Sequence, residues 1–186
     1  MHHTIRFYTG KRSTVLWLYM FFGAWTKIPL VDRLVRWLAN TYGRVAHQGY
    51  LLTPAEADEL VEISEGVAAA PCSCRKLAGN CDNPADNEIL LGPTRHVLLE
   101  TMPDDSREID KEKARAILKD SHERGLIFTV MRCREDFYAI CSCCTCCCVP
   151  LRLKNKYGIG DVVVRHKNIV QEFRDYQSHQ LAHMHD

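Results

Sequence analysis

The sequence predicts an α+β fold in which a helical N-terminal arm precedes a cysteine-rich region with short strands. Apolar residues recur at helical spacing between residues 30 and 38, and Thr53-Pro54-Ala55-Glu56 is a helix-start signal. The short, partly β-branched run Leu126–Met131 follows Gly125 and is typical of a strand. With 186 residues, of which 25% are charged, the chain is long enough for one domain and too polar for an integral membrane protein.

Residues 1–50 are predicted to form a basic, amphipathic helical arm. They contain seven Lys and Arg and one acidic residue, whereas residues 51–148 contain eleven Lys and Arg and eighteen acidic residues. The apolar run Val15–Trp25 is too short to cross about 30 Å of hydrocarbon as a helix. An amphipathic helix follows Pro29 and ends within residues 40–43. We expect these apolar faces to pack on the protein or on a partner subunit, and peripheral contact with the inner face of a membrane is the alternative.

The next segment is predicted to alternate helices with strands. The capping box at Thr53–Glu56 begins a helix whose apolar face continues to Ala68, and Pro71 ends it. A later helix begins at the N-cap Asp110 and ends at Gly125. The remaining predictions are a short helix at residues 88–91 and strands at residues 95–100, 126–131 and 137–140.

The ten cysteines are the most informative residues of the chain. Six lie within eight consecutive residues, where neighbours would compete for the separation and direction that each disulfide needs. No convincing secretory signal accompanies them, so we expect a cytoplasmic, reducing compartment, in which dense cysteines indicate metal or redox chemistry. The candidate metal ligands are Cys72, Cys74, Cys81, Cys141, Cys143, Cys144, Cys146, Cys147 and Cys148.

The spacing within the cysteine block favours an iron–sulfur cluster. Cys141-x2-Cys144-x2-Cys147 is the spacing by which one loop wraps three irons of a [4Fe-4S] cluster, and Cys143-x2-Cys146 lies inside it. A bacterial-type motif ends with a fourth cysteine three residues on and then proline, which Cys148-Val149-Pro150 only approximates. Zinc also binds thiolates at such spacing and is the main alternative, although a run of adjacent cysteines gains nothing in a structural zinc site.

The order of these motifs resembles a group of ferredoxin-like 4Fe-4S proteins found in anaerobic microbes. The resemblance rests on Cys72-x-Cys74-Arg75, on Cys81-Asp82-Asn83-Pro84, on Gly125-Leu126 and on the cysteine block after Ile140, and it covers roughly residues 70–150. It implies iron–sulfur binding and electron transfer in a ferredoxin-like cluster-binding region, without a named reaction. The arm and the C-terminal residues lie outside it.

Ligand counting also favours two clusters. Two [4Fe-4S] clusters need eight thiolates, and the candidate ligands provide nine. Which cysteine is spare stays open, as does the role of Cys133, which lies eight residues before the block. We therefore divide the chain into the arm (residues 1–50), an iron–sulfur cluster domain (residues 51–170) and a polar C-terminal tail (residues 171–186). The tail contains His179, His183 and His185, which we leave out of the site because terminal polar segments are commonly loosely ordered.

The predicted function is one-electron transfer with a redox protein partner or within a larger complex, rather than self-contained enzyme activity. Arg75, next to Cys74, is expected to stabilise the more negative reduced state of the nearer cluster. The alternatives are a cluster-bearing enzyme that acts on a small molecule and a zinc-binding interaction module. Nucleic-acid binding is not expected, because the net charge of +1 lacks the basic excess of such proteins.

Overall fold

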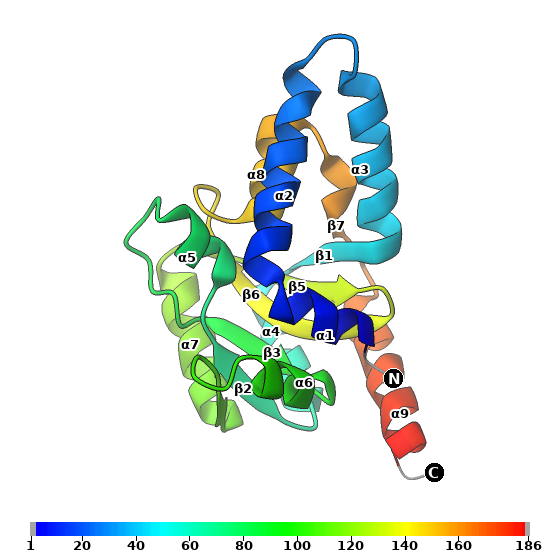
Figure 1. Cartoon of the computed structure of the whole chain (residues 1–186). Coiled ribbons are helices and arrows are strands. Elements are labelled where there is room, and N and C mark those ends of the chain that lie inside the picture. The colour runs from blue at the N-terminus through cyan, green and yellow to red at the C-terminus, as the bar shows by residue number, and fades with distance from the viewer. Residues whose placement is uncertain (1–2, 185–186) are drawn as a thin grey trace.

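The computed structural model describes residues 3–184 and confirms the α+β fold class (Figure 1). The described strands are β1 (His47–Leu52), β2 (Val67–Ala70), β3 (Glu88–Leu91), β4 (Arg107–Ile109), β5 (Ile127–Cys133), β6 (Asp136–Cys143) and β7 (Val163–Arg165). Within residues 3–184 they form one seven-stranded sheet in the order β4-β2-β3-β6-β5-β1-β7. Neighbouring strands are antiparallel, apart from the parallel pair β1 and β7.

Helices cover both faces of this sheet. The described α-helices are α1 (His3–Gly10), α2 (Arg12–Ala24), α3 (Asp32–Ala46), α4 (Pro54–Ile63), α5 (Ser73–Ala78), α6 (Thr94–Thr101), α7 (Lys111–Glu123), α8 (Val149–Tyr157) and α9 (Ile169–Met184). α4, α7 and α9 pack on the face that carries Val130 and Ile140, whereas α1 and α6 pack on the face that carries Met131 and Ala139. Because side chains alternate along paired strands, β5 and β6 contribute to both cores.

α2 and α3 form a helical hairpin that projects from the sheet, with α8 beside it (Figure 1). A single 3-10 turn, η1 (Trp25–Lys27), follows α2 and leads toward α3. Gly23 permits the close approach of α2 to α8, because a Cβ at this position would lie 2.7 Å from Leu153 Cδ2. In the described part of the chain, no helix is both long enough and apolar enough to cross a membrane.

The helix starts predicted at Thr53 and Asp110 are confirmed. The Thr53 hydroxyl accepts a hydrogen bond from the Glu56 N–H (3.2 Å), and the Glu56 carboxylate accepts one from the Thr53 N–H (2.7 Å). The Asp110 carboxylate accepts one from the Lys113 N–H (2.6 Å). The two strands predicted after Gly125 are present as β5 and β6, and β6 runs on into the cysteine block.

Three local predictions between these helices are wrong. The helix predicted to continue to Ala68 ends at Ile63, and residues 67–70 form β2 between β3 and β4. Residues 88–91 form β3 instead of a helix, because they pair with both β2 and β6. Residues 95–100, predicted as a strand, lie within α6. Pairing and packing override weak local propensity in these short segments.

The C-terminal residues differ from the expectation of loose order. α9 extends to Met184, because Ile169 and Phe173 are fully buried against the sheet. His179 lies on this helix, whereas His185 and the side chain of His183 lie outside the described part of the structure.

Candidate metal centre

Four cysteine sulfurs meet at one end of the sheet, and we call them the outer thiol group. The Sγ atoms of this group all lie within 4.8 Å of one another. Cys81 Sγ lies 3.7 Å from Cys144 Sγ and 3.6 Å from Cys147 Sγ. Its members are Cys81, Cys144, Cys146 and Cys147. Such a set of soft ligands can hold a metal ion.

Two segments that lie far apart in the sequence build the outer thiol group. α5 ends at Gly79, whose left-handed φ of 59° redirects the chain toward Cys81. The side chain of Asn80 then donates to the carbonyl of Cys146 (3.0 Å), and the side chain of Asn83 donates to Cys81 Sγ (3.6 Å). The Asn80 hydrogen bond joins the loop after α5 to the loop after β6, whereas the Asn83 hydrogen bond lies within the loop after α5.

The other five candidate ligands form a second set, which we call the inner thiol group. Cys148 Sγ lies 3.3 Å from Cys143 Sγ, and further sulfur pairs link the set into a chain: Cys72 with Cys74, Cys74 with Cys148, and Cys141 with Cys143. This group packs in an apolar cluster with Leu16 of α2 and Val149 of α8. The members are Cys72, Cys74, Cys141, Cys143 and Cys148.

The inner and outer thiol groups share one loop. Cys143 belongs to the inner group and its neighbour Cys144 to the outer group. The same holds for Cys148 and Cys147 at the start of α8. Consecutive Cα atoms are about 3.8 Å apart, so the two groups lie side by side. All nine candidate ligands fall into one group or the other. The prediction that Cys141-x2-Cys144-x2-Cys147 surrounds one cluster is not met, because Cys141 lies in the inner group and Cys144 and Cys147 lie in the outer group; Cys143-x2-Cys146 is divided in the same way.

Cys133 lies apart from both thiol groups. It ends β5, where it pairs with His47 of β1, and it packs in a different apolar cluster with Ile5 and Tyr138. Burial raises the pKa of Cys133 to about 11, which makes it an unreactive thiol at neutral pH.

A buried ion pair lies next to the inner thiol group. Arg12 of α2 approaches Glu88 of β3 to 2.7 Å, and the two side chains are 7% and 1% exposed. Glu88 pairs with Cys141 across the sheet. Among the described residues, Nε and Nη1 of Arg12 have no hydrogen-bond partner although they are buried. Two donor nitrogens and a positive charge are therefore held beside the inner group, which suits a negatively charged centre.

Arg75 bridges the two thiol groups from α5. Its guanidinium donates to the carbonyl of Ser142 (3.0 Å), to Asn87 Oδ1 (2.9 Å) and to Cys144 Sγ (3.7 Å). It also donates to the carbonyl of Pro84. Arg75 therefore lies where the sequence predicted a cation beside the sulfurs, and it fixes the two cysteine-bearing segments together.

Hydrogen bonds favour thiolates in part of the site. The Asn83 backbone N–H, supported by its side chain, lowers the pKa of Cys81 to about 6. Hydrogen bonds from Cys148 and Cys72 hold the pKa of Cys74 well below its usual range, against the effect of burial. Metals bind the thiolate form, so each group contains at least one sulfur that is ready to ligate at neutral pH.

The sequence did not reveal Arg12, Glu88 or Asn87 as parts of the site. In the sequence, Arg12 is only a charged residue before an apolar run, and nothing local links it to cysteines 60 or more residues away. Glu88 stands in a short segment whose secondary structure was predicted wrongly.

Comparison of the chain with known protein families, with curated proteins and with solved structures finds no match. The site itself is therefore the basis for a functional assignment, and it supports metal binding by clustered cysteines.

Proposed function

We propose that this protein transfers electrons and holds two [4Fe-4S] clusters, one in each thiol group. The outer thiol group supplies the four ligands of one cluster, Cys81, Cys144, Cys146 and Cys147. The inner thiol group supplies four of its five cysteines to the other. The observation that carries the proposal is that a single loop serves both groups through adjacent residues.

Because one loop carries ligands of both groups, the two clusters are placed close together, which favours electron transfer. Two clusters bound to neighbouring residues of one loop lie close enough for electrons to pass between them. The inner group is embedded among apolar side chains, whereas Cys81 and Cys146 of the outer group are half-buried near the surface. An electron therefore enters or leaves through the outer cluster, where a redox partner protein can approach. The motif resemblance to ferredoxin-like 4Fe-4S proteins supports iron–sulfur binding as such, although the proposed ligand sets differ from the predicted spacing, since Cys141 is assigned to the other cluster than Cys144 and Cys147.

The charges around the sulfurs also support it. Reduction adds negative charge to a cluster that already carries four thiolates. Arg75 is only 4% exposed and hydrogen-bonds Cys144, and Arg12 lies beside the inner group. Hydrogen bonds to sulfur and nearby positive charge are the usual means by which a protein sets the potential of a cluster.

One observation favours a second candidate, a pair of structural zinc ions. A tetrahedral ion with Zn–S bonds of about 2.3 Å places its sulfurs about 3.8 Å apart. Three separations in the outer group, between Cys81 and Cys144, Cys81 and Cys147, and Cys146 and Cys147, are 3.7, 3.6 and 3.8 Å. A [4Fe-4S] cluster needs the four thiolates further apart, so the loops that carry Cys81 and Cys146 would have to open to hold one.

Paired serine substitutions distinguish the two candidates and test the division into two groups. Cys81→Ser with Cys147→Ser is expected to remove one cluster, and Cys74→Ser with Cys148→Ser the other. In each case about four iron and four sulfide ions per chain should be lost and about as many retained. Cys133→Ser is the matched control and should retain both clusters. Zinc without inorganic sulfide in the anaerobically purified protein would instead support the second candidate.

A further inference from the structure

The helical hairpin leaves an unusual number of large apolar side chains exposed. Leu30, in the turn of the hairpin, is 96% exposed, and Trp37 on α3 is 61% exposed. Across the described chain, most of the exposed large hydrophobic residues belong to this hairpin. The hairpin residues concerned are Trp17, Leu18, Phe21, Phe22, Trp25, Ile28, Leu30, Leu34, Trp37, Leu38, Tyr42 and Val45. Apolar surface of this extent indicates a binding face.

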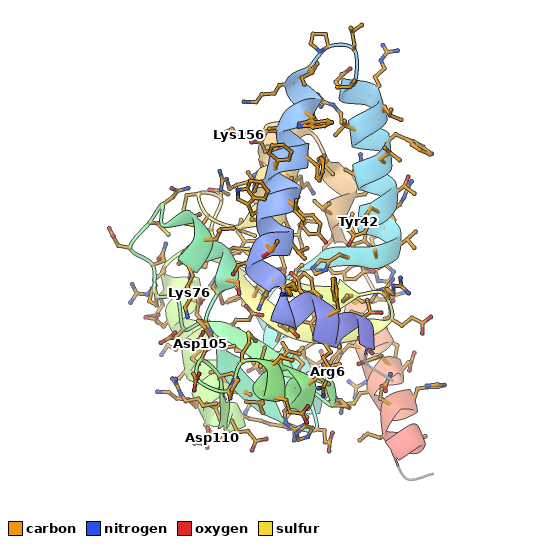
Figure 2. The ribbon with its side chains drawn as sticks, viewed as in Figure 1. Arg6, Tyr42, Lys76, Asp105, Asp110 and Lys156 are labelled. Carbon is orange, nitrogen blue, oxygen red and sulfur yellow. The ribbon has the colours of Figure 1, made fainter. Side chains whose placement is uncertain are left out.

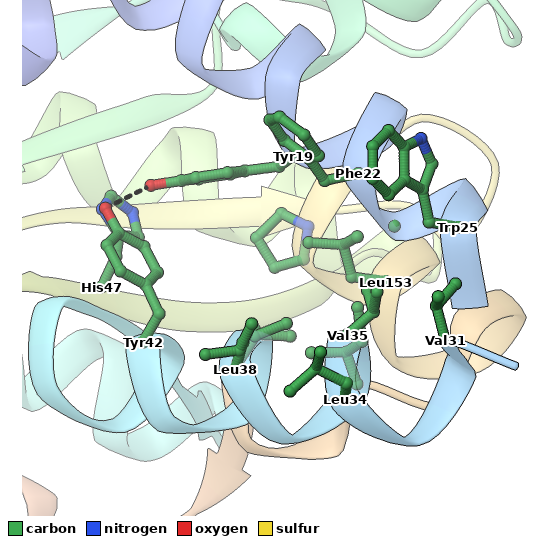
Figure 3. A pocket seen from close by; sticks show the side chains of 15 residues that line it. Tyr19, Phe22, Trp25, Val31, Leu34, Val35, Leu38, Tyr42, His47 and Leu153 are labelled. Carbon is green, nitrogen blue, oxygen red and sulfur yellow. Dashed lines mark hydrogen bonds between the residues drawn. The ribbon is translucent and has the colours of Figure 1, made fainter.

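A groove of about 490 Å³ runs between the two helices of the hairpin (Figure 3). Leu34 and Leu38 of α3 line one wall, and Phe22 and Trp25 line the facing wall. The groove ends near His47, where the hydroxyl groups of Tyr19 and Tyr42 are 2.9 Å apart. Within residues 3–184, no charged side chain lines the groove. The side chains of α2 and α3 therefore do not fill the space between the two helices. The surface that faces this groove and the solvent-exposed surface of the hairpin are both apolar.

Basic residues surround this apolar surface. Lys27 lies in the turn and Arg33 in the first part of α3, and both are exposed. Lys156 of α8 lies beside the hairpin (Figure 2). Asp32 is the sole acidic residue between positions 11 and 46, which contain six Lys and Arg. Of these six, Arg12 is buried against Glu88, Arg36 pairs with Asp32 and Arg44 pairs with Asp161, which leaves Lys11, Lys27 and Arg33 to give this surface its positive charge. A protein partner with a neutral apolar surface would gain nothing from this charge, whereas a surface that combines hydrocarbon with phosphate would use both features.

We propose that the hairpin α2–η1–α3 is a docking surface for an anionic lipid bilayer, into which its turn inserts. α2 has 13 residues and spans about 20 Å, so the inserted hairpin is too short to cross the bilayer. Tryptophan is enriched at the level of the lipid headgroups, and Trp17, Trp25 and Trp37 are all on the hairpin. The exposed leucine of the turn reaches the acyl chains, and the basic residues contact the headgroups.

If the proposed function is correct, docking of the hairpin also positions the two clusters relative to the membrane. Leu16 of α2 packs in the same apolar cluster as Cys74 and Cys148. Docking of the hairpin therefore holds the protein, with both thiol groups, at the membrane surface, where a membrane-bound redox partner can approach the outer cluster.

Vesicle binding tests the docking surface directly. The chain contains three tryptophans, and all three lie on the hairpin, so intrinsic fluorescence reports on this element alone. The full-length protein should float with vesicles of equal parts phosphatidylcholine and phosphatidylglycerol, its emission should shift to the blue, and lipids brominated on the acyl chains should quench it. Binding to phosphatidylcholine alone should be much weaker, because each basic residue near an anionic surface contributes about fivefold to the partition coefficient.

Three variants make the test specific. Leu30→Glu should lower binding at least tenfold, because it places a charge where the turn enters the hydrocarbon. Arg33→Gln should lower it about fivefold on anionic vesicles. Phe7→Glu is the matched control, since Phe7 is 69% exposed on α1, outside the hairpin, and it should bind as the wild type does. Circular dichroism should show the same helix content in all four proteins.

Two results would overturn the proposal. One is the absence of binding to anionic vesicles by the folded wild type. The other is a blue shift that depends on protein concentration and not on lipid, accompanied by dimers in analytical ultracentrifugation, because the hairpin would then cover a second copy of itself. Neither result depends on metal content, so failure here is separable from failure of the iron–sulfur assignment.

Discussion

Replacement of Arg12 by methionine is expected to lower the free energy of unfolding by about 4 kcal/mol. Arg12 Nη2 lies 2.7 Å from Glu88 Oε1 and 2.8 Å from Oε2, and the two side chains are 7% and 1% exposed. Without the guanidinium, the carboxylate remains buried and unpaired, and removal of one partner of a buried ion pair costs about 3–5 kcal/mol. The loss in stability also reports how much the Arg12–Glu88 ion pair contributes to the packing of α2 against β3, since it joins these two elements.

A matched pair of variants isolates the buried interaction. The double variant Arg12→Met with Glu88→Gln should recover more than half of the loss, because no unpaired charge then remains inside. Arg6→Met breaks the ion pair with Glu100, whose side chains are 59% and 61% exposed, and should cost less than about 1 kcal/mol. Denaturant titrations followed by circular dichroism, under anaerobic conditions and at equal metal content, give these values. A loss for Arg12→Met no larger than that for Arg6→Met would refute the reasoning.

Three further predictions follow from the site and its surroundings. Arg75→Ala should lower the reduction potential of the nearer cluster by tens of millivolts, because a buried cation beside Cys144 favours the reduced state, and an unchanged potential in voltammetry would refute that role. Burial lowers the pKa of His47 from 6.5 to about 4, so between these values the unfolded chain binds a proton that the folded protein excludes, and stability should fall by about 2 kcal/mol from pH 7 to pH 5. His47→Gln should lose this pH dependence in urea titrations, and an identical dependence in both proteins would contradict the assignment. Cys133→Ser should leave the iron content unchanged and lower stability by about 1–3 kcal/mol, because it places a hydroxyl in an apolar cluster; a loss of iron would make Cys133 a ligand.

The elements with strong end signals could be predicted from the sequence. The capping box at Thr53 and the N-cap Asp110 are local devices, and each determines a helix start without help from distant residues. β2 and β3 have four residues each, too few for a periodic pattern to separate strand from helix. Their conformation depends on pairing with β4 and β6, which are distant in the sequence. The sequence alone therefore predicts the fold class and not the strand order.

Metal binding by clustered cysteines could be predicted, because crowding of thiols in residues 141–148 excludes ordinary disulfides. Four of the nine candidate ligands, Cys81, Cys144, Cys146 and Cys147, meet in a possible metal site. The division of the candidate ligands into an inner and an outer group could not be predicted, since it depends on where Gly79 turns the chain and on β6, which places Cys141 and Cys143, two residues apart, on one face. The position of Arg12 beside the cysteines could not be predicted for the same reason, because only the tertiary structure brings α2 next to them. The basic, aromatic arm was visible in the sequence, but the hairpin and its groove required the structure.

Metal and sulfide analysis of the full-length protein, purified without oxygen, tests the central claim most directly. Two [4Fe-4S] clusters predict about eight iron and eight inorganic sulfide ions per chain, a brown colour that dithionite bleaches, and electron paramagnetic resonance signals from two interacting reduced clusters. A colourless protein that contains about two zinc ions and no sulfide would contradict the account.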